Sequence, residues 1–313
     1  MNRISARLVA TVATLGLLIS SPATVSAVTS TPTPAQLTAE IVAASKTATS
    51  VNLSSQLAGA ANSSYEQGPC VQSQSVPGDR FTSCDFGTTS ASKTVVLLGD
   101  SQASMWLPAF DAAGKAHNFH VILLSRLGCN SNPIVLKSFS GSVDAGCAVF
   151  RTATLKYIKT LTAPLVFVAQ IHRFAQYANG TAVSNAAWTA SMNTFFASLK
   201  SAGATVSFIE PAPVSPVDAA GCLSRNIGAS QKCTFTLDKG VVADSRASDD
   251  AAVIKSKVSM VNTFSLFCTA TAVVATTKCP AQVAGLLVYS DRWHTTTQYA
   301  THVWQAMAAL TKL

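Results

Sequence analysis

Short apolar runs recur along the chain and alternate with longer segments of mixed hydrophobic and polar residues. The runs occupy residues 94–98, 120–125, 165–169, 205–209 and 286–289. Successive apolar residues, many of them Val, Ile or Leu, are typical of strands that are buried on both faces of a parallel sheet. The pattern therefore predicts five buried strands.

The segments between these runs carry apolar residues at helical spacing. Helices are predicted at residues 103–117, 148–161, 186–202 and 245–266, and in a final segment that follows Thr295 or Thr296 and runs through Ala308. Strands that alternate with helices form a parallel sheet with helices on both faces. We therefore expect an α/β fold: a three-layer α/β/α sandwich around a five-stranded, doubly wound parallel sheet in the flavodoxin-like order 2-1-3-4-5.

The start of the chain has the pattern of a targeting segment. Arg3 and Arg7 precede an apolar run at residues 8–19, and small residues follow up to Ala27. A basic start, a short apolar run and small residues at the cleavage site are typical of a secretory signal peptide. Residues 1–27 are therefore predicted to be a signal peptide. The protein is expected to be secreted or to lie in the cell envelope.

A leader is predicted between the signal peptide and the folded domain. Residues 28–65 are rich in Thr, Ser, Ala and Pro, with one helical pattern at residues 36–45. Such a composition fits either a mobile tether or a segment that packs on the domain through a short helix. The domain itself is expected at residues 66–313.

Charge and composition exclude one class of partner. The chain has a formal net charge of +8, and two of the basic residues, Arg3 and Arg7, lie in the predicted signal peptide. The remaining Lys and Arg residues are scattered and form no run. Nucleic-acid binding requires a concentrated basic face, so no nucleic-acid partner is expected.

The cysteines favour disulfides. They form four couples of near neighbours, which predict the bonds Cys70–Cys84, Cys129–Cys147, Cys222–Cys233 and Cys268–Cys279. Metal binding is the alternative, but no C-x-x-C motif or Cys/His knuckle occurs. An oxidising compartment, which the signal peptide implies, favours disulfides.

Three residues form a candidate catalytic set. Ser101 follows the first apolar run directly, and Asp291 and His294 follow the last one. Ligands of open α/β sheets bind at the carboxyl ends of the strands, so these residues are expected at one edge. A serine hydroxyl needs a base to become a nucleophile, and a histidine oriented by a carboxylate is such a base. Each motif alone is common, but together they predict a Ser-His-Asp site.

These motifs resemble those of the SGNH (GDSL-like) hydrolase superfamily. The residues concerned are Gly99-Asp100-Ser101, the glycine loop Gly128-Cys129 and Asp291-x-x-His294. The resemblance covers residues 66–313 and is closest to the SGNH domain that is fused to bacterial membrane O-acyltransferases. It implies Ser101 as nucleophile, His294 as base and Asp291 as the group that orients it.

The resemblance also implies an oxyanion hole, and here the sequence departs from the family pattern. The backbone N–H groups of Ser101 and Gly128 are the implied donors. An Asn after the third strand is a further donor in the superfamily, but this chain has Gln170 and Arg173 there, either of which could supply a substitute. Relatives in this subgroup carry His after the serine, where this chain has Gln102.

The sequence therefore predicts an exported serine esterase or O-acyltransferase that acts on acyl groups, most readily acetyl, of a cell-envelope glycan or glycolipid. Neither a cofactor nor a metal is needed for this chemistry. A separate membrane protein is a candidate acyl donor. The alternatives are a non-catalytic glycan-binding module that keeps the fold, and a lipid esterase.

Overall fold

The computed structural model describes residues 31–47, 53–65, 70–73, 84–137, 145–171, 175–177 and 179–313. The chain from Thr31 to Leu313 forms one compact unit. The predicted signal peptide, residues 1–27, lies outside the described residues. Within the described part of the chain, no helix combines the length and hydropathy needed to cross a membrane.

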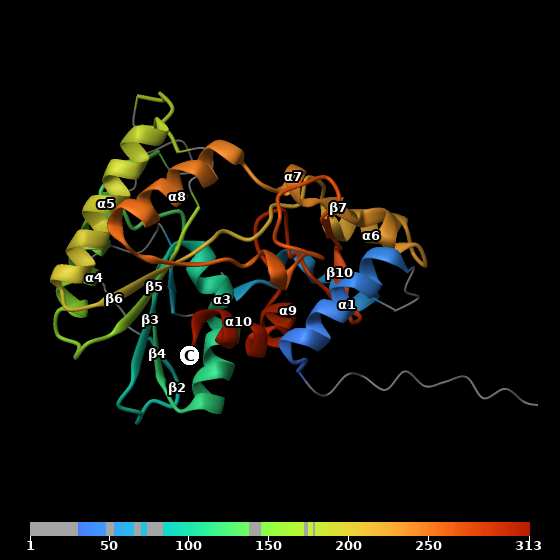
Figure 1. Ribbon diagram of the computed structural model, residues 1–313, viewed down its shortest axis with the longest axis horizontal. Helices are drawn as coiled ribbons and strands as arrows, with labels where there is room; N and C mark the ends of the chain where they lie inside the picture. The colour runs from blue at the N-terminus through green and yellow to red at the C-terminus, as the bar shows by residue number, and fades with distance from the viewer. Residues whose placement is uncertain are drawn as a thin grey trace, which may run out of the picture. The chain divides into compact units, whose positions relative to one another are not determined.

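Helices and strands alternate through the central part of the chain (Figure 1). The α-helices are α1 (Pro34–Lys46), α2 (Ser54–Ala58), α3 (Ser101–His117), α4 (Ala145–Ile158), α5 (Asn185–Ser201), α6 (Ala219–Arg225), α7 (Leu237–Gly240), α8 (Ala243–Ser256), α9 (Thr297–His302) and α10 (Trp304–Thr311). The 3-10 helices are η1 (Ala60–Asn62), η3 (Ser230–Cys233) and η4 (Phe264–Leu266). The strands are β1 (Val71–Gln72), β2 (Cys84–Gly87), β3 (Thr94–Gly99), β4 (His120–Arg126), β5 (Leu165–Ala169), β6 (Thr205–Ile209), β7 (Phe235–Thr236), β8 (Ser259–Val261), β9 (Lys278–Cys279), β10 (Gln282–Val283) and β11 (Leu286–Leu287).

The central sheet has the order β1-β4-β3-β5-β6-β8, and β2 pairs with β4. All of these neighbours are parallel except β2, which is antiparallel to β4. The first four predicted strands are confirmed as β3, β4, β5 and β6. Their order, with the second strand outside the first and the third and fourth on its other side, is the predicted one.

The fifth predicted strand was wrong. Residues 286–289 were expected to complete the parallel sheet, but β11 pairs only with β10 in a separate antiparallel ladder. The position beside β6 is instead occupied by β8, which pairs with β6 and lies inside the segment predicted as a helix at 245–266. That helix, α8, ends at Ser256. An apolar run indicates burial and not the sheet to which a strand belongs: Leu287 of β11 and the following Val288 are fully buried, yet they lie outside the main sheet.

Both faces of the sheet are covered. Along β3, Val95 and Leu97 pack with α1, α3, α9 and α10, whereas Val96 and Leu98 pack with α5 and α8. Successive side chains of a strand point to opposite faces, so an uninterrupted apolar run places a core on each face. Figure 1 shows α4 and α5 on one side of the strands and α3 and α10 on the other.

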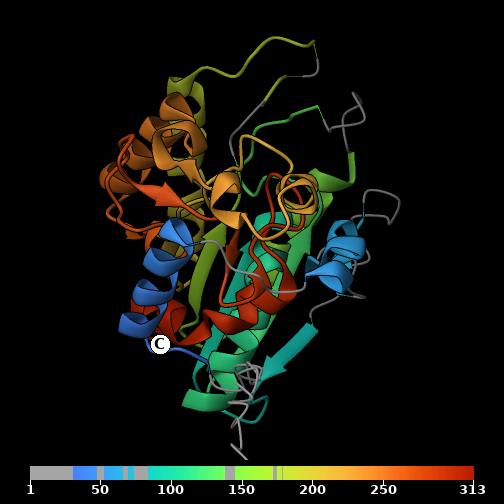
Figure 2. The same ribbon diagram turned by 90° about the vertical axis from the view of Figure 1, so that its right-hand side faces the viewer.

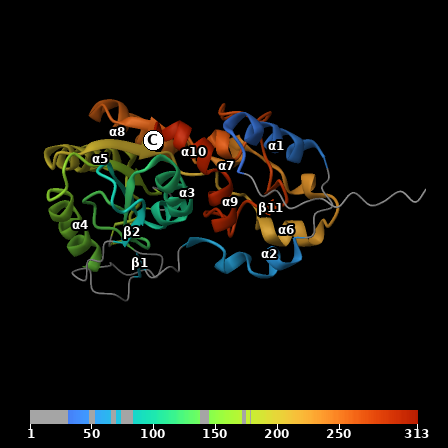
Figure 3. The ribbon, with the colours of Figure 1, turned by 90° about the horizontal axis from the view of Figure 1, so that it is seen from below.

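The predicted leader segment contains helices that pack on the rest of the unit. Leu37 and Ile41 of α1 are 1% and 0% exposed, and α1 lies beside the C-terminal helix α10 (Figure 2). Gln56 of α2 donates to the carbonyl of Gly285, and α2 lies beside α6 (Figure 3). The described residues therefore adopt the packed alternative for this segment.

The four predicted disulfides are confirmed. They are Cys70–Cys84, Cys129–Cys147, Cys222–Cys233 and Cys268–Cys279. Cys129–Cys147 ties the loop after β4 to α4, and Cys268–Cys279 closes part of the long segment before the last helices.

Candidate active site

Ser101 lies just beyond the carboxyl end of β3, where the chain passes from the strand into helix α3. A glycine is required just before this point, because a Cβ atom at Gly99 would lie 1.8 Å from the carbonyl oxygen of Ala169 in the neighbouring strand. Ser101 is the first residue of α3, and the first N–H groups of a helix have no partner within it. The serine hydroxyl therefore lies at the N-terminus of α3, where the helix dipole favours negative charge.

Asp100 fixes the turn that carries the serine. Its Oδ1 accepts a hydrogen bond of 2.8 Å from the N–H of Gln102, which caps α3. Its Oδ2 accepts one of 3.2 Å from the N–H of Ile171, just beyond β5. The Asp100 carboxylate therefore joins the ends of two neighbouring strands and holds Ser101 between them.

Asp291, His294 and Ser101 form a continuous hydrogen-bonded chain. Asp291 Oδ2 lies 2.7 Å from His294 Nδ1, and His294 Nε2 lies 2.8 Å from Ser101 Oγ. Asp291 Oδ1 also accepts the N–H groups of Trp293 and His294, at 2.6 and 2.8 Å. One carboxylate thus shapes the turn and orients the imidazole ring that the turn carries.

The Asp291 carboxylate fixes the tautomer of His294. Partial burial raises the pKa of Asp291, but the hydrogen bond and charge of His294 and the N–H groups of Trp293 and His294 outweigh it, so that this pKa lies below its usual range. An ionised Asp291 can only accept, so His294 Nδ1 carries the proton and donates it to the carboxylate. His294 Nε2 then accepts from the Ser101 hydroxyl.

Two contacts outside the turn hold it against the sheet. Gln102 Nε2 donates to the carbonyl of Trp293 over 3.1 Å. Arg292 Nε donates to the carbonyl of Ser215 over 3.0 Å, and the N–H of Ser215 donates back to the carbonyl of Arg292 over 2.9 Å. The turn is therefore anchored to α3 on one side and to the loop after β6 on the other.

The expected oxyanion residues lie in different surroundings. Gly128 stands in an exposed turn directly after β4, with φ +65°. Gln170 is buried: its Oε1 accepts the N–H of Ser131 over 2.6 Å, and its Nε2 donates to Met192 Sδ over 2.8 Å. Both ends of its amide therefore take part in contacts within the fold, and its oxyanion role stays a prediction. Arg173 lies outside the described residues.

Sequence reasoning did not find the contact of Gln102, although it singled this residue out as a departure from the family pattern. It also missed Glu210, which follows β6 at the same edge of the sheet as Ser101. The signal was present, because Glu210 is a charged residue directly after an apolar run.

The fold and this site are those of an α/β protein with a serine, a histidine and an aspartate at the carboxyl edge of a parallel sheet. The family model described as SGNH domain (fused to AT3 domains) matches residues 69–309. The chain therefore belongs to this SGNH domain family. A search of the curated proteins found no match.

Two solved structures are similar to the chain. One is the periplasmic domain of a lipopolysaccharide acetyltransferase from Salmonella ser. Paratyphi A, with a TM-score of 0.55 and 14% identity over 72% of this chain and 87% of that one. The other is a GDSL-like lipase from Bacteroides thetaiotaomicron, with a TM-score of 0.37 and 16% identity over 71% of this chain and 89% of that one. The first shares the fold of this chain.

Proposed function

We propose that this protein is an exported serine esterase or O-acyltransferase that acts on the O-acyl groups of a cell-envelope glycan or glycolipid. The observation that carries this proposal is the unbroken chain of hydrogen bonds from Ser101 Oγ through His294 to Asp291. Membership of the SGNH domain family supports it independently of the geometry.

The reaction follows from the positions of these three side chains. His294 Nε2 takes the proton as Ser101 Oγ attacks the acyl carbonyl, and Asp291 stabilises the imidazolium that forms. The same Nε2 then returns the proton to the departing alcohol, which leaves an acyl-serine. Water or a sugar hydroxyl attacks this ester in the second half, with His294 again as the base.

The oxyanion of each tetrahedral intermediate needs donors near Ser101. The N–H of Ser101 is one proposed donor, since it lies in the first turn of α3, where the helix dipole favours negative charge. The N–H of Gly128 is the other, because β4 and β3 end side by side, with Ser125 opposite Gly99. Arg173 stays a prediction as a third donor.

The substrate class and location rest on resemblance. The similar acetyltransferase domain is described as periplasmic and as acting on lipopolysaccharide, and the family is described by its fusion to AT3 domains. We infer that this chain acts outside the cytoplasm, after cleavage of residues 1–27, and receives or removes acyl groups on an envelope glycan. A membrane acyltransferase encoded separately is the proposed acyl donor.

Hydrolysis of p-nitrophenyl acetate by residues 28–313 tests the proposal, with Ser101→Ala as the matched variant. The substitution removes one hydroxyl group at the start of α3 and leaves an excellent helix former. We expect turnover to fall by at least about 10³-fold, because the nucleophile is lost. Equal rates for the two proteins would contradict the enzyme proposal and favour the binding module.

A second measurement separates esterase from transferase. Acetylated and bare envelope polysaccharides are offered in turn, the bare one together with p-nitrophenyl acetate as acyl donor. Release of acetate from the acetylated polysaccharide indicates an esterase, and acetylation of the bare polysaccharide indicates a transferase. Preference for long-chain p-nitrophenyl esters over both glycans would instead favour the lipid esterase.

A further inference from the structure

A pocket opens at the same edge of the sheet as Ser101, outside the candidate active site. It lies between α8, η4 and the ends of β6 and β8. Neighbouring strands are spaced by about 4.8 Å, so the end of β6 lies about 10 Å from the end of β3, two strands away. The pocket is therefore separate from the hydrogen-bonded chain described above and close to it.

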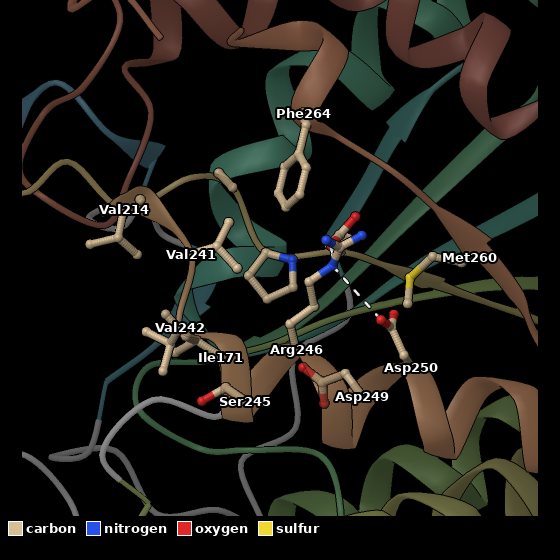
Figure 4. A pocket seen from close by; sticks show the side chains of 14 residues that line it. Ile171, Val214, Val241, Val242, Ser245, Arg246, Asp249, Asp250, Met260 and Phe264 are labelled. Atoms are coloured by element: carbon tan, nitrogen blue, oxygen red, sulfur yellow. Dashed lines mark ion pairs between the residues drawn. The ribbon is translucent and has the colours of Figure 1, made fainter. Parts of the chain in front are cut away.

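Its walls are mostly apolar, and its charged groups are gathered on one side. Figure 4 shows Val214, Val241 and Val242 on the left, Phe264 above and Met260 on the right. The charged lining residues are Glu210, Arg246, Asp249 and Asp250. A few polar groups within an apolar lining are typical of small-molecule sites.

Glu210 is the distinctive group in this lining. Its side chain is only 4% exposed, and its Oε1 lies 2.7 Å from Arg246 Nε. Its Oε2 is buried, and within the described part of the chain it has no hydrogen-bond partner. A buried acceptor without a partner is costly, so a donor brought by a ligand would relieve that cost.

The charges of the cluster favour a neutral ligand. Burial raises the pKa of Glu210 to about 7 and that of Asp249 to about 8. Near neutral pH Asp249 is therefore largely uncharged, and Arg246 faces both Glu210 and Asp250, the latter at 3.8 Å. Little uncompensated negative charge remains to attract a cation. A purely apolar ligand would leave Glu210 Oε2 unpaired.

Two loop segments at the pocket wall are hydrogen-bonded to the candidate active site. The N–H of Ile171, which lines the pocket, donates to Asp100, beside Ser101. Val214 also lines it, and the next residue, Ser215, bonds to Arg292 in the turn of Asp291 and His294. The wall of the pocket is thus tied by hydrogen bonds to the two turns that carry Ser101 and His294.

We propose that this pocket binds a neutral sugar ring of the glycan substrate, with Glu210 Oε2 accepting a hydrogen bond from a ring hydroxyl and the apolar wall contacting the C–H face of the ring. The identification of the ligand as part of a glycan rests on the proposed function. The pocket, its buried acceptor and its contacts with the site do not.

Ligand-observed NMR tests binding, using residues 28–313 with Ser101→Ala so that no substrate is consumed. The probes are glucose, galactose, N-acetylglucosamine and their disaccharides, with glucosamine as the cationic arm. We expect at least one neutral sugar to bind. Its affinity should fall about tenfold in Glu210→Gln, which keeps the side-chain volume but replaces one acceptor oxygen with a donor.

Two variants, one at the N-cap residue of α8 and one within the helix, test whether the sugar binds in this pocket. Val242→Trp, in the pocket wall, should fill the cavity and abolish binding. Ile254→Trp adds the same side chain to the same helix at a position that is 76% exposed, and it should leave the affinity unchanged. Circular dichroism verifies the fold of each protein, and Glu210→Gln retains the test if Val242→Trp does not fold.

Three outcomes would overturn this proposal: no neutral sugar binds, glucosamine alone binds, or Val242→Trp and Glu210→Gln both bind as well as the parent protein. These outcomes are distinct from a failure of the proposed function. The latter is measured by p-nitrophenyl acetate turnover in the protein that retains Ser101, which requires no sugar.

Discussion

At the scale of single residues, Gln102 is the side chain that connects the two halves of the candidate active site. It follows Ser101 in sequence, is 2% exposed, and donates from Nε2 to the carbonyl of Trp293. That carbonyl belongs to the turn between Asp291 and His294. The position of the imidazole relative to the serine hydroxyl therefore depends on a hydrogen bond that neither residue makes itself.

Gln102→Leu is expected to lower kcat for p-nitrophenyl acetate by about tenfold to 100-fold, because a small displacement of His294 disrupts proton transfer from Ser101. KM should change little. The substitution removes the hydrogen bond of Gln102 Nε2, but it also removes Gln102 Oε1, a buried oxygen that has no partner in the described residues. The two effects oppose each other, so the melting temperature should change little. Steady-state kinetics and thermal unfolding check these outcomes.

Gln102→His serves as the conservative control, since an imidazole N–H can also donate to the carbonyl of Trp293. We expect it to recover much of the activity that Gln102→Leu loses. A loss of kcat in both variants together with a lower melting temperature would indicate a packing role for Gln102 and contradict the positioning role.

At the scale of elements, α1 shows that the folded unit extends into the segment expected as a leader. Leu37 and Ile41 pack in the same core cluster as α3, α9 and α10. Glu40 Oε2 lies 2.8 Å from His302 Nε2, and Thr33 caps the helix in a capping box with Gln36. The helix thus joins the two ends of the compact unit.

Leu37→Ala is expected to lower the free energy of unfolding by about 2–5 kcal/mol, since it removes a fully buried side chain and leaves a cavity. Thr38→Ala, exposed on the same helix, should change it by less than about 1 kcal/mol. Urea unfolding of both variants measures the difference. Equal stabilities for the two would mean that α1 is a tether and contributes nothing to the core.

Strands also mark what the sequence could and could not predict. β3 to β6 are runs of apolar residues buried on both faces, so their pattern was sufficient. β8 is only Ser259–Val261, too short to stand out beside the helix that precedes it. Residues 286–289 are as apolar as a strand because they are buried, although the backbone of β11 pairs outside the main sheet.

The residues of the candidate site also fall into those that the sequence could predict and those that it could not. Ser101, Asp291 and His294 could be predicted because each adjoins an apolar run and carries a recognisable chemistry. The roles of Gln170 and Gln102 could not, because an amide can donate to or accept from many partners and only the fold selects one. Glu210 was readable as a charged residue after a strand, but its pocket depends on α8 and η4, which are distant in sequence.

At the scale of the whole molecule, buried carboxyl groups couple the stability of the fold to pH. Asp249 on α8 accepts a hydrogen bond of 2.7 Å from Trp188 Nε1 on α5, and both side chains are buried. Burial raises the pKa of Asp249 to about 8, although the Trp188 hydrogen bond opposes the shift. The neighbouring charges of Asp250 and Glu210 raise it further.

The folded protein therefore holds a proton that the unfolded chain, with an aspartate pKa of about 3.9, releases. The stability gained from protonated Asp249 is fully present below pH ~4 and is lost as pH rises toward about 8, at up to about 1.4 kcal/mol per pH unit. Glu210 acts in the same direction up to about pH 7.

Asp249→Asn keeps the acceptor for Trp188 and cannot ionise, so it should gain stability relative to the native protein as pH rises. Urea unfolding at pH 5, 7 and 9 should show this gain exceeding about 1 kcal/mol by pH 9. Asp244→Asn, at an exposed position on the same helix, should show no such gain, and parallel curves for Asp249→Asn and the native protein would mean that Asp249 is ionised in the fold.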